Sequence, residues 1–340
     1  MKRYGYLYEQ VYDMDNLRLA HKMARKGKTW YADVRMVDSN PDKYLSRLAK
    51  SLKEQTYKTS PYVDFTIIDK GKERDISKLP YYPDRICHWA IMLVLEPIFM
   101  KTFISDTYAS IPGRGVHLAS NRIRKALHDI EGTQYCLKMD IKKYFPSIDH
   151  GILKQKLRKK IKDEKMLWLL DEIIDSYDNG IPIGNYLSQY FANFYLSEID
   201  HAIKERLRCK YYWRYMDDMV ILSDDKEWLW WCFSYIDSMV NRLNLQMKRN
   251  YQVFPVDKRG VDFLGFVHYH GYTMLRKKIA QRIKNKSHEL QSRRLVERDR
   301  NSVMSYYGWL IHANCKHFMH IYLDTIIRRF DDEITVSHTA

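Results

Sequence analysis

The chain has 340 residues, which is long enough to bury a hydrophobic core and to form one to three closely packed subdomains. Its formal net charge of +15 favours a polyanionic partner, nucleic acid above all, over a basic protein without such a partner. The five cysteines are scattered without a C-x-x-C pair, which argues against a zinc knuckle or a disulfide framework. The longest apolar run, Trp89–Leu95, is too short to span a bilayer, and no apolar signal segment follows Met1. We therefore expect a cytoplasmic protein with no membrane partner.

The first part of the chain is predicted to contain mostly helices and one hairpin. The expected elements are basic amphipathic helices at Leu17–Lys28 and Tyr44–Leu52, strands at Phe65–Ile68 and Arg74–Ile76 around a turn at 69–72 that contains Gly71, a helix from Arg85 to about Met100 capped by Asp84, and a basic helix from Val116 to Ile130.

The second part alternates short strands with helices. The expected elements are a strand at Tyr135–Asp140, helices at 151–177 and 187–207, strands at Tyr211–Tyr215 and Met219–Leu222, a helix at 226–243, strands near Gln246–Pro255 and Val261–His268, and helices from Arg276 onward. Trp228, Trp230 and Trp231 lie at helical spacing and are expected in the core. This order of elements predicts the α+β fold class.

Three aspartates fit the needs of nucleotidyl transfer, which uses carboxylates on rigid backbone to hold two divalent ions roughly 3.5–4 Å apart. A turn at Met216-Asp217-Asp218 presents two of them, and a neighbouring strand that ends at Asp140 can bring the third. Each feature alone has an ordinary explanation, because Asp is common in solvated turns and Asp140 can also cap a helix. The surrounding sequence blocks decide between these explanations.

The ordered blocks of this chain resemble those of reverse transcriptases. Arg214-Tyr-Met-Asp-Asp-Met-Val-Ile-Leu-Ser223 is similar to the Y-x-D-D block, and Lys138-Met-Asp-Ile-Lys-Lys-Tyr-Phe-Pro-Ser147 is similar to the first catalytic block. The other blocks, in the order of the family, are Arg74 with Pro83-Asp84-Arg85, Ile111–Gly115, Leu245–Lys248, Phe263–Phe266, and Ser305–Trp309 with His312–Asn314. The resemblance covers nearly the whole chain.

The resemblance implies a right-hand polymerase of the α+β class, with fingers, a palm made of an antiparallel sheet and helices, and a short helical thumb. On this basis residues 1–60 form a basic helical extension, 61–270 form the fingers and palm, and 271–340 form the thumb. The fingers occupy 61–134 and about 150–185, and the palm occupies the rest of the middle part.

The resemblance also implies the site residues. Asp140, Asp217 and Asp218 would be catalytic and, with Ile141, would hold two Mg²⁺ ions, which Mn²⁺ can replace. Phe145 would be a steric gate that favours dNTPs over NTPs, although a gate residue also packs like a core residue. Other contacts to the dNTP are expected from Arg74, Arg85, Ile183, Gly184, Gln189 and Lys248, and contacts to template and primer from Arg114, Ser188, Leu264 and Gly265.

Several of these assignments have alternatives. Arg74 and Arg85 suit a triphosphate because guanidinium groups form paired hydrogen bonds to phosphate, but either can instead be a surface ion-pair residue. Lys248 is a candidate proton donor to the pyrophosphate leaving group, and a lone lysine is often only a solvated side chain.

The block Gly180-Ile-Pro-Ile-Gly-Asn-Tyr-Leu-Ser-Gln189 departs from the Q-G-x-x-x-S-P pattern of group II intron enzymes. Ile183 replaces the glutamine and Gln189 replaces the proline, a pattern similar to the reverse transcriptases of diversity-generating retroelements. The resemblance implies that this glutamine lies near the incoming nucleotide. An apolar side chain in its place offers no hydrogen bond that discriminates between nucleotides, so we expect error-prone copying. The resemblance implies that errors concentrate opposite template adenines. The alternative is a core isoleucine in an enzyme of ordinary fidelity.

The expected partners are template RNA, the RNA–cDNA duplex, dNTPs and a small basic accessory protein oligomer, in the cytoplasm of a bacterial or phage host cell. The basic stretches Leu17–Lys28 and Arg276–Lys286 are predicted to contact phosphates. We expect no nuclease after the thumb, so the primer would come from elsewhere. Two alternatives remain: a group II-like or defence-associated enzyme, and an RNA-binding scaffold with a silent polymerase fold, against which the three carboxylates argue.

Overall fold

The computed structural model describes residues 3–69 and 72–330. The chain divides into two compact units. The first unit contains Met1–Ser110, Asp140–Arg208 and Ser234–Arg249, and the second contains Ile111–Met139, Cys209–Phe233 and Asn250–Ala340. Among the described residues no helix is both long and apolar enough to cross a membrane. Helices and antiparallel strands occur in both units, as the predicted α+β class requires.

The first unit is mainly helical. Its elements are α1 (Tyr8–Tyr12), α2 (Met14–Ala24), α3 (Ala32–Ser39), α4 (Pro41–Lys53), β1 (Val63–Asp69), β2 (Lys72–Lys78), the π-helical turn η1 (Tyr81–Arg85), α5 (Ile86–Met100), the 3-10 turn η3 (Phe145–Ser147), α7 (His150–Lys160), α8 (Glu164–Asp175), α9 (Tyr186–His201) and η4 (Ala202–Arg206). The helix α10 (Lys226–Arg242) begins in the second unit and ends in the first.

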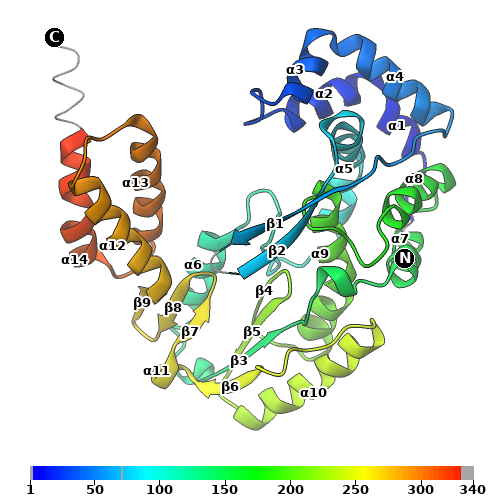
Figure 1. Ribbon diagram of the computed structural model, residues 1–340. Helices are drawn as coiled ribbons and strands as arrows, with labels where there is room; N and C mark the ends of the chain where they lie inside the picture. The colour runs from blue at the N-terminus through cyan, green and yellow to red at the C-terminus, as the bar shows by residue number, and fades with distance from the viewer. Residues whose placement is uncertain (1–2, 70–71, 331–340) are drawn as a thin grey trace. The chain divides into compact units, whose positions relative to one another are not determined.

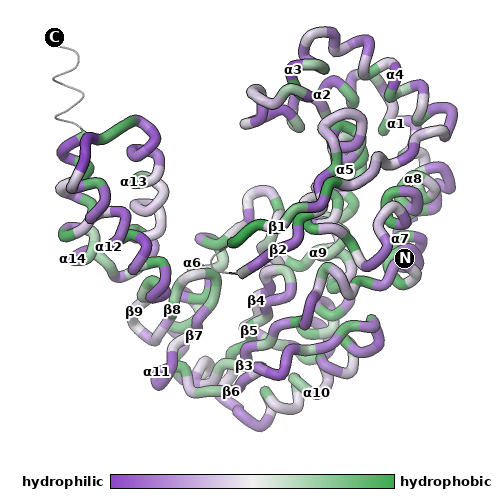
Figure 2. Tube along the Cα trace, viewed as in Figure 1, coloured by the Kyte–Doolittle hydropathy of each residue, from purple (hydrophilic) through white to green (hydrophobic). Residues whose placement is uncertain are grey.

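The N-terminal helices pack around α5, as Figure 1 shows. Hydrophobic residues make up most of α5, and Figure 2 shows this apolar segment near the helices α2 and α4, which contain more polar residues. Leu17 of α2 and Leu45 of α4 are fully buried, and the Asn16 side-chain amide donates to the Ala90 carbonyl of α5 at 3.1 Å. Both predicted amphipathic helices of this region are present, although α2 ends at Ala24, before the predicted end at Lys28, and the short helices α1 and α3 were not predicted.

The predicted hairpin is present as antiparallel β1 and β2, paired from Val63↔Lys78 to Asp69↔Lys72. The turn residue Gly71 lies outside the described residues. At its other end β2 connects to the segment before α9, because the Ser77 amide donates to the Ile183 carbonyl at 3.1 Å. The hairpin is thereby fixed to the segment in which the sequence departs from group II intron enzymes.

The prediction that Asp84 caps the next helix is wrong. Asp84 lies inside η1 with no solvent exposure, and its Oδ1 accepts hydrogen bonds from the Tyr57 hydroxyl and the Ser60 amide. The helix α5 begins after Arg85 without any side-chain cap. A buried carboxylate that ties the segment between α4 and β1 to the helix start replaces the expected local cap.

The expected helix at 151–177 is broken into α7 and α8. Ile161 leaves the helix and forms a parallel bridge with Tyr4, and Asp163 caps α8 by accepting from the Met166 amide. Asp163 also accepts from the amides of Leu7 and Tyr8. The break is therefore caused by the N-terminal segment, which the local pattern of residues 151–177 cannot reveal.

The second unit holds two sheets and a helical C-terminal part. Its elements are α6 (Val116–Ala126), the 3-10 turn η2 (Glu131–Thr133), β3 (Tyr135–Asp140, whose last residue begins a segment of the first unit), β4 (Tyr211–Tyr215), β5 (Asp218–Ser223), β6 (Gln252–Pro255), α11 (Val256–Arg259), β7 (Val261–Phe263), β8 (Phe266–Tyr269), β9 (Tyr272–Leu275), α12 (Lys277–Gln291), α13 (Glu297–Leu310), α14 (Lys316–Met319) and η5 (His320–Asp324). The helix α6 ends at Ala126, before the predicted end at Ile130.

The larger sheet has the strand order β4-β5-β3-β6. The pairs β4–β5 and β3–β6 are antiparallel, and β3 has the predicted bounds. The expected strand from Gln246 to Pro255 is shorter than predicted, because only Gln252–Pro255 pairs as β6. Residues 246–248 instead run alongside the residues that come directly after β3. An antiparallel bridge joins Ile141 to Met247 there.

The expected single strand from Val261 to His268 is wrong, because Leu264 and Gly265 form a tight turn between β7 and β8. Both residues have positive φ, 52° and 92°, and Phe263 pairs with Phe266 across the turn. A Cβ on Gly265 would lie 2.7 Å from the Trp309 ring, so glycine lets α13 approach. The strand β9 completes a three-stranded sheet that was not predicted.

The C-terminal helices pack on this small sheet around a core that includes Phe266, Ile283, Leu290, Val303 and Leu310. The helices predicted from Arg276 onward are confirmed, and α12 and α13 lie side by side in Figure 1. The prediction that the three tryptophans of α10 are core residues is wrong. Trp231 is 55% exposed, and Trp228 and Trp230 are only partly buried.

Candidate active site

The acidic pair lies in a tight turn between β4 and β5. Tyr215 pairs with Asp218, so Met216 and Asp217 form the turn, and Met216 has a φ of 54°. Met216 is buried, and its carbonyl accepts a hydrogen bond from Arg214 Nη1 at 2.9 Å. Arg214 has no solvent exposure, whereas Asp217 and Asp218 are half-buried. A buried cation thus supports a turn that carries two carboxylates.

The strand β5, which begins at Asp218, is the neighbour of β3, which ends at Asp140. The carboxylate of Asp218 is close enough to Cys136 of β3 to act on it electrostatically. Burial first, and also this carboxylate, raise the pKa of the Cys136 thiol, against the opposing effect of Lys138. Cys136 is therefore a protonated core residue and not a nucleophile.

Asp140 is held by the segment 246–248. The Lys248 amide donates to the Asp140 carbonyl at 2.8 Å, and Lys248 Nζ forms an ion pair with Asp140 Oδ2 at 2.5 Å. The Lys248 side chain is 36% exposed and the Asp140 side chain 29%. Asp140 Oδ1 is buried, and among the described residues it has no hydrogen-bond partner. One oxygen of this carboxylate therefore has an unused acceptor site.

The predicted gate residue Phe145 is connected to the segment that contains Ile183. The Phe145 carbonyl accepts from the Ile181 amide at 3.0 Å. Gly180 has a φ of 65°, and a Cβ on it would lie 2.2 Å from the Phe145 carbonyl oxygen. Phe145 is half-buried, and Ile183 is also half-buried and not a core residue. Hydrogen bonds thus join Phe145 to residues 180–183, and these to β2.

The other predicted dNTP contacts are spread over the first unit. Arg74 lies on β2, paired with Ile67, and is exposed. Gly184 has a φ of 128°, and a Cβ there would lie 2.8 Å from the Ser77 carbonyl. Gln189 Oε1 accepts from the Ser110 hydroxyl at 3.3 Å. Arg85 and Gly184 both line a pocket that the N-terminal helices help to form, and Arg74 is not among its lining residues, so the structure does not group Arg85 with Arg74.

The residues around the acidic turn and the sheet match a model of the reverse transcriptase (RNA-dependent DNA polymerase) family over residues 58–268. The chain belongs to the reverse transcriptase family. Relatives of this family member include Protein YkfC of Escherichia coli (strain K12), which is 28% identical over 148 residues, covering 40% of this chain and 39% of that protein.

Two further relatives are of different types. The group II intron-encoded protein LtrA of Lactococcus lactis subsp. cremoris is 29% identical over 178 residues, covering 49% of this chain and 29% of that protein. The retron Ec73 reverse transcriptase of Escherichia coli is 26% identical over 172 residues, covering 46% of this chain and 53% of that protein. The chain therefore spans between about a third and half of the length of these relatives.

The predicted template–primer residues of this reverse transcriptase lie in both units. Arg114 precedes α6 and is half-buried, and Leu264 and Gly265 form the β7–β8 turn. Ser188 of α9 is only 3% exposed, so the structure does not bring it to the surface. Within residues 3–69 and 72–330 no three His, Cys, Asp or Glu side chains are gathered as a ready metal cluster.

Sequence reasoning missed two supporting features of the site. The first is Arg214, whose burial places it under the acidic turn, although a charged residue between apolar strand neighbours was a signal available in the sequence. The second is the ion pair between Lys248 and Asp140, which joins residues 108 positions apart and gives no local signal.

Proposed function

We propose that the chain is an RNA-directed DNA polymerase that copies template RNA into cDNA by two-metal nucleotidyl transfer. The observation that carries the proposal is the tight turn that presents Asp217 and Asp218 at the start of β5, beside the strand that ends at Asp140. Membership of the reverse transcriptase family supports it. Fingers, palm and thumb, at the boundaries expected from the sequence, belong to this proposal.

The three carboxylates have the donor chemistry that a divalent cation needs, although the described residues do not gather them into a ready cluster. Three carboxylates supply the hard oxygen ligands that Mg²⁺ prefers, and Asp140 Oδ1 is a buried oxygen without a hydrogen-bond partner among the described residues. Asp140, Asp217 and Asp218, with Ile141, would hold the two ions, for which Mn²⁺ can substitute. When bound, such ions activate the primer hydroxyl and stabilise charge on the phosphates.

The side chains of the chain itself have distinct proposed tasks. Arg74 binds oxygens of the triphosphate, Arg85 binds a phosphate in its separate pocket, and Lys248 delivers a proton to the pyrophosphate leaving group. Phe145 fills the space that a ribose 2′ hydroxyl requires. Gly184 and Gln189 line the dNTP site, and Arg114, Ser188, Leu264 and Gly265 contact template and primer.

Primer extension on an RNA template with Mg²⁺ tests the polymerase. Wild type should incorporate dNTPs, and Asp217→Ala/Asp218→Ala should lose at least about a thousandfold in rate, since transition-state charge stabilisation is lost. The double variant should keep the far-UV circular dichroism of the wild type, because both side chains are only half-buried. Equal incorporation by both proteins would refute the proposal and leave an RNA-binding scaffold.

We further propose the reverse transcriptase of a diversity-generating retroelement, which acts in mutagenic retrohoming with a small basic accessory protein in a bacterial or phage-infected cytoplasm. Ile183 supports this proposal, because its half-buried side chain offers no hydrogen bond to a nascent base pair. Group II intron and retron relatives favour the alternative, an enzyme of ordinary fidelity.

The error spectrum of the cDNA separates the two. The wild type should misincorporate mainly opposite template adenines, and Ile183→Gln should lower the error frequency by about tenfold, as expected when a hydrogen-bonding handle is restored. Ile181→Gln is the matched control, since Ile181 is a buried residue of the same segment and should not restore fidelity. An unchanged spectrum in Ile183→Gln would favour the alternative.

A further inference from the structure

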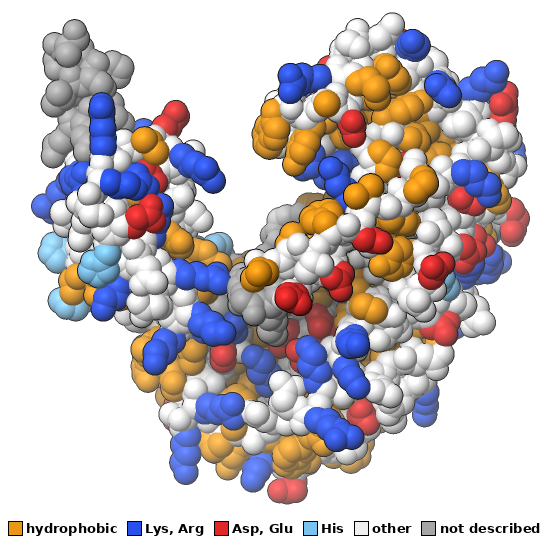
Figure 3. Space-filling view, in the orientation of Figure 1, with side chains coloured by type: hydrophobic (Ala, Val, Ile, Leu, Met, Phe, Trp, Pro, Cys, Tyr) orange, Lys and Arg blue, Asp and Glu red, His pale blue; other side chains and the backbone are white. Residues whose placement is uncertain are grey.

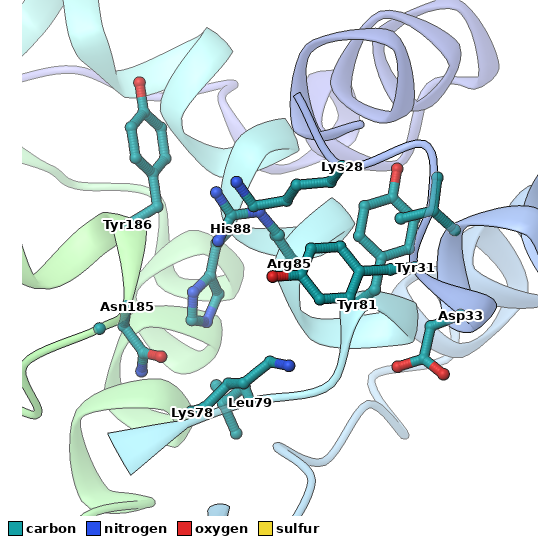
Figure 4. A pocket seen from close by; sticks show the side chains of 12 residues that line it. Lys28, Tyr31, Asp33, Lys78, Leu79, Tyr81, Arg85, His88, Asn185 and Tyr186 are labelled. Atoms are coloured by element: carbon teal, nitrogen blue, oxygen red, sulfur yellow. The ribbon is translucent and has the colours of Figure 1, made fainter. Parts of the chain in front are cut away.

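A pocket in the first unit collects three cations and several aromatic side chains. Lys28 and Tyr31 come from the segment between α2 and α3, Lys78 from the end of β2, and Arg85 and His88 from η1 and α5. Figure 4 shows the ends of Lys28 and Arg85 close together, with Asp33, the carboxylate of the pocket lining, apart from them. The α2–α3 segment precedes residue 58, where the match to the family begins.

Within the part of the chain that the structure describes, these cations have no anionic partner. Lys28, Lys78 and Arg85 make no ion pair with any described residue, and Arg85 Nε is a buried donor without a hydrogen-bond partner among them. His88 Nε2 is buried and unpaired in the same described region. Burial lowers the pKa of Lys28, and so do the charges of Arg85 and Lys78, which indicates that the three cations repel one another. A bound anion would remove this repulsion.

An aromatic platform, Trp30 and Tyr31, lies beside the cations. The two rings stack with centroids 5.5 Å apart, and they are 63% and 45% exposed. Lys78 Nζ lies 5.2 Å from the centre of the Tyr31 ring, so the platform and the pocket share one side chain. Figure 3 shows hydrophobic and basic side chains next to each other at the edge of the α2–α3 region. Exposed indole rings next to cations are typical of surfaces that bind single-stranded nucleic acid.

We infer that this pocket binds a backbone phosphate of single-stranded RNA, with an adjacent base stacked on Trp30. Lys28, Lys78 and Arg85 supply the charge that a phosphodiester needs, and Trp30 supplies a face that any base can use. The platform argues for a polynucleotide over the triphosphate of a free nucleotide, which offers the same phosphate chemistry. The inference rests on the proposed function in taking RNA as the polymer, and it extends the RNA-binding surface to the N-terminal helices.

Fluorescence anisotropy with a labelled single-stranded RNA of about a dozen nucleotides, without dNTPs, tests the inference. Lys28→Gln/Lys78→Gln should weaken binding about tenfold or more. It should also make the slope of log affinity against log salt shallower by about 0.7 for each phosphate that the protein no longer neutralises. Trp30→Ala should weaken binding at least about fivefold. Lys28→Arg/Lys78→Arg should bind within about threefold of wild type, because it keeps the charge.

Matched controls in the same unit remove the same groups elsewhere. Lys53→Gln removes an exposed lysine at the end of α4, and Tyr6→Ala removes a ring that is 87% exposed. Both should bind within about twofold of wild type, as expected for surface sites away from the ligand. If Lys53→Gln weakens binding as much as the double variant, the effect is general charge and the inference is overturned.

The KM for dNTPs in primer extension shows whether the pocket binds an RNA backbone phosphate or the triphosphate of a free nucleotide. A double variant that binds RNA normally but has a raised KM for dNTPs would assign the pocket to the triphosphate and overturn the inference. Normal RNA binding with a normal KM, or a wild type that does not bind the RNA, would overturn it as well. Anisotropy measures RNA binding without catalysis, so its outcome is independent of the polymerase test. A protein that extends no primer can still bind RNA at this pocket, and an active polymerase can still fail to bind RNA there.

Discussion

The chain positions its predicted catalytic carboxylates in two different ways. Asp217 lies in a two-residue turn and Asp218 begins the strand that follows it, and the fully buried Arg214 donates to the carbonyl of this turn. Asp140 lies at a strand end, where the partly exposed Lys248 pairs with one of its oxygens. A buried cation fixes geometry but is costly to remove, whereas an exposed ion pair contributes little to stability and exchanges readily. The backbone that carries Asp217 and Asp218 is therefore held rigidly, whereas Asp140 can exchange its partner.

The largest effect is expected from a substitution of Arg214, which supports the acidic turn. Arg214→Met should lower the free energy of unfolding by about 1–3 kcal/mol and reduce primer extension at least about a hundredfold, because the Met216 carbonyl loses its buried donor and the acidic turn relaxes. Urea unfolding and extension rates measure the two effects. Arg300→Met, which removes an exposed arginine of α13, should change the stability by less than about 0.5 kcal/mol. A stable and active Arg214→Met would show that the buried cation does not hold the turn.

Substitutions of two glycines test whether the crowded backbone around Phe145, five residues after Asp140, contributes to stability. Gly180→Ala should lower the free energy of unfolding by at least about 2 kcal/mol, because its Cβ would overlap the Phe145 carbonyl and its φ is positive. Gly271→Ala also has a positive φ but meets no atom within 4 Å, so it should lose only about 1 kcal/mol. Thermal unfolding measures both, and equal losses would exclude a contribution from crowding at Phe145.

The proposed sugar gate, Phe145, follows Asp140 by five residues in the sequence and lies outside the acidic turn. Phe145→Ala should raise the incorporation of NTPs relative to dNTPs by about 10–100-fold, as expected for the loss of a steric contact. Tyr144→Phe removes a buried hydroxyl that donates to the Ala192 carbonyl, and should cost about 1 kcal/mol of stability without changing sugar selection. Single-nucleotide incorporation assays measure the ratio of NTP to dNTP incorporation. If Phe145→Ala keeps the wild-type ratio, Phe145 is not a steric gate.

The smallest effect is expected at the exchangeable ion pair. Lys248→Met should lower the Mg²⁺ concentration for half-maximal extension by about threefold, because a surface ion pair of this kind is worth at most about 1 kcal/mol and competes with the metal for Asp140. This readout is separate from the maximal rate, which falls if Lys248 donates a proton. Lys258→Met, an exposed lysine of α11, is the matched control and should behave as wild type. An unchanged Mg²⁺ requirement in Lys248→Met would exclude the competition.

The strands that carry the three aspartates could be predicted from the sequence, because apolar runs end there on acidic residues with few local alternatives. What could not be predicted depends on distant partners. Ile161 leaves its helix to pair with Tyr4, and Asp84 is drawn into the core by Tyr57 and Ser60. The predicted group of two triphosphate arginines was divided for the same reason, since the N-terminal helices enclose Arg85 in their pocket.

The packing of α2 on α5 has a consequence for anyone who would trim the protein to the part that resembles its relatives. Residue 58 looks like a natural place to cut, since the family match begins there. Removing what precedes it would expose the apolar surface of α5 to water and would take away the amides of Leu7 and Tyr8 that donate to Asp163. A protein shortened in this way is expected to aggregate. The first helices share a core with α5, and a stable shortened protein must keep them.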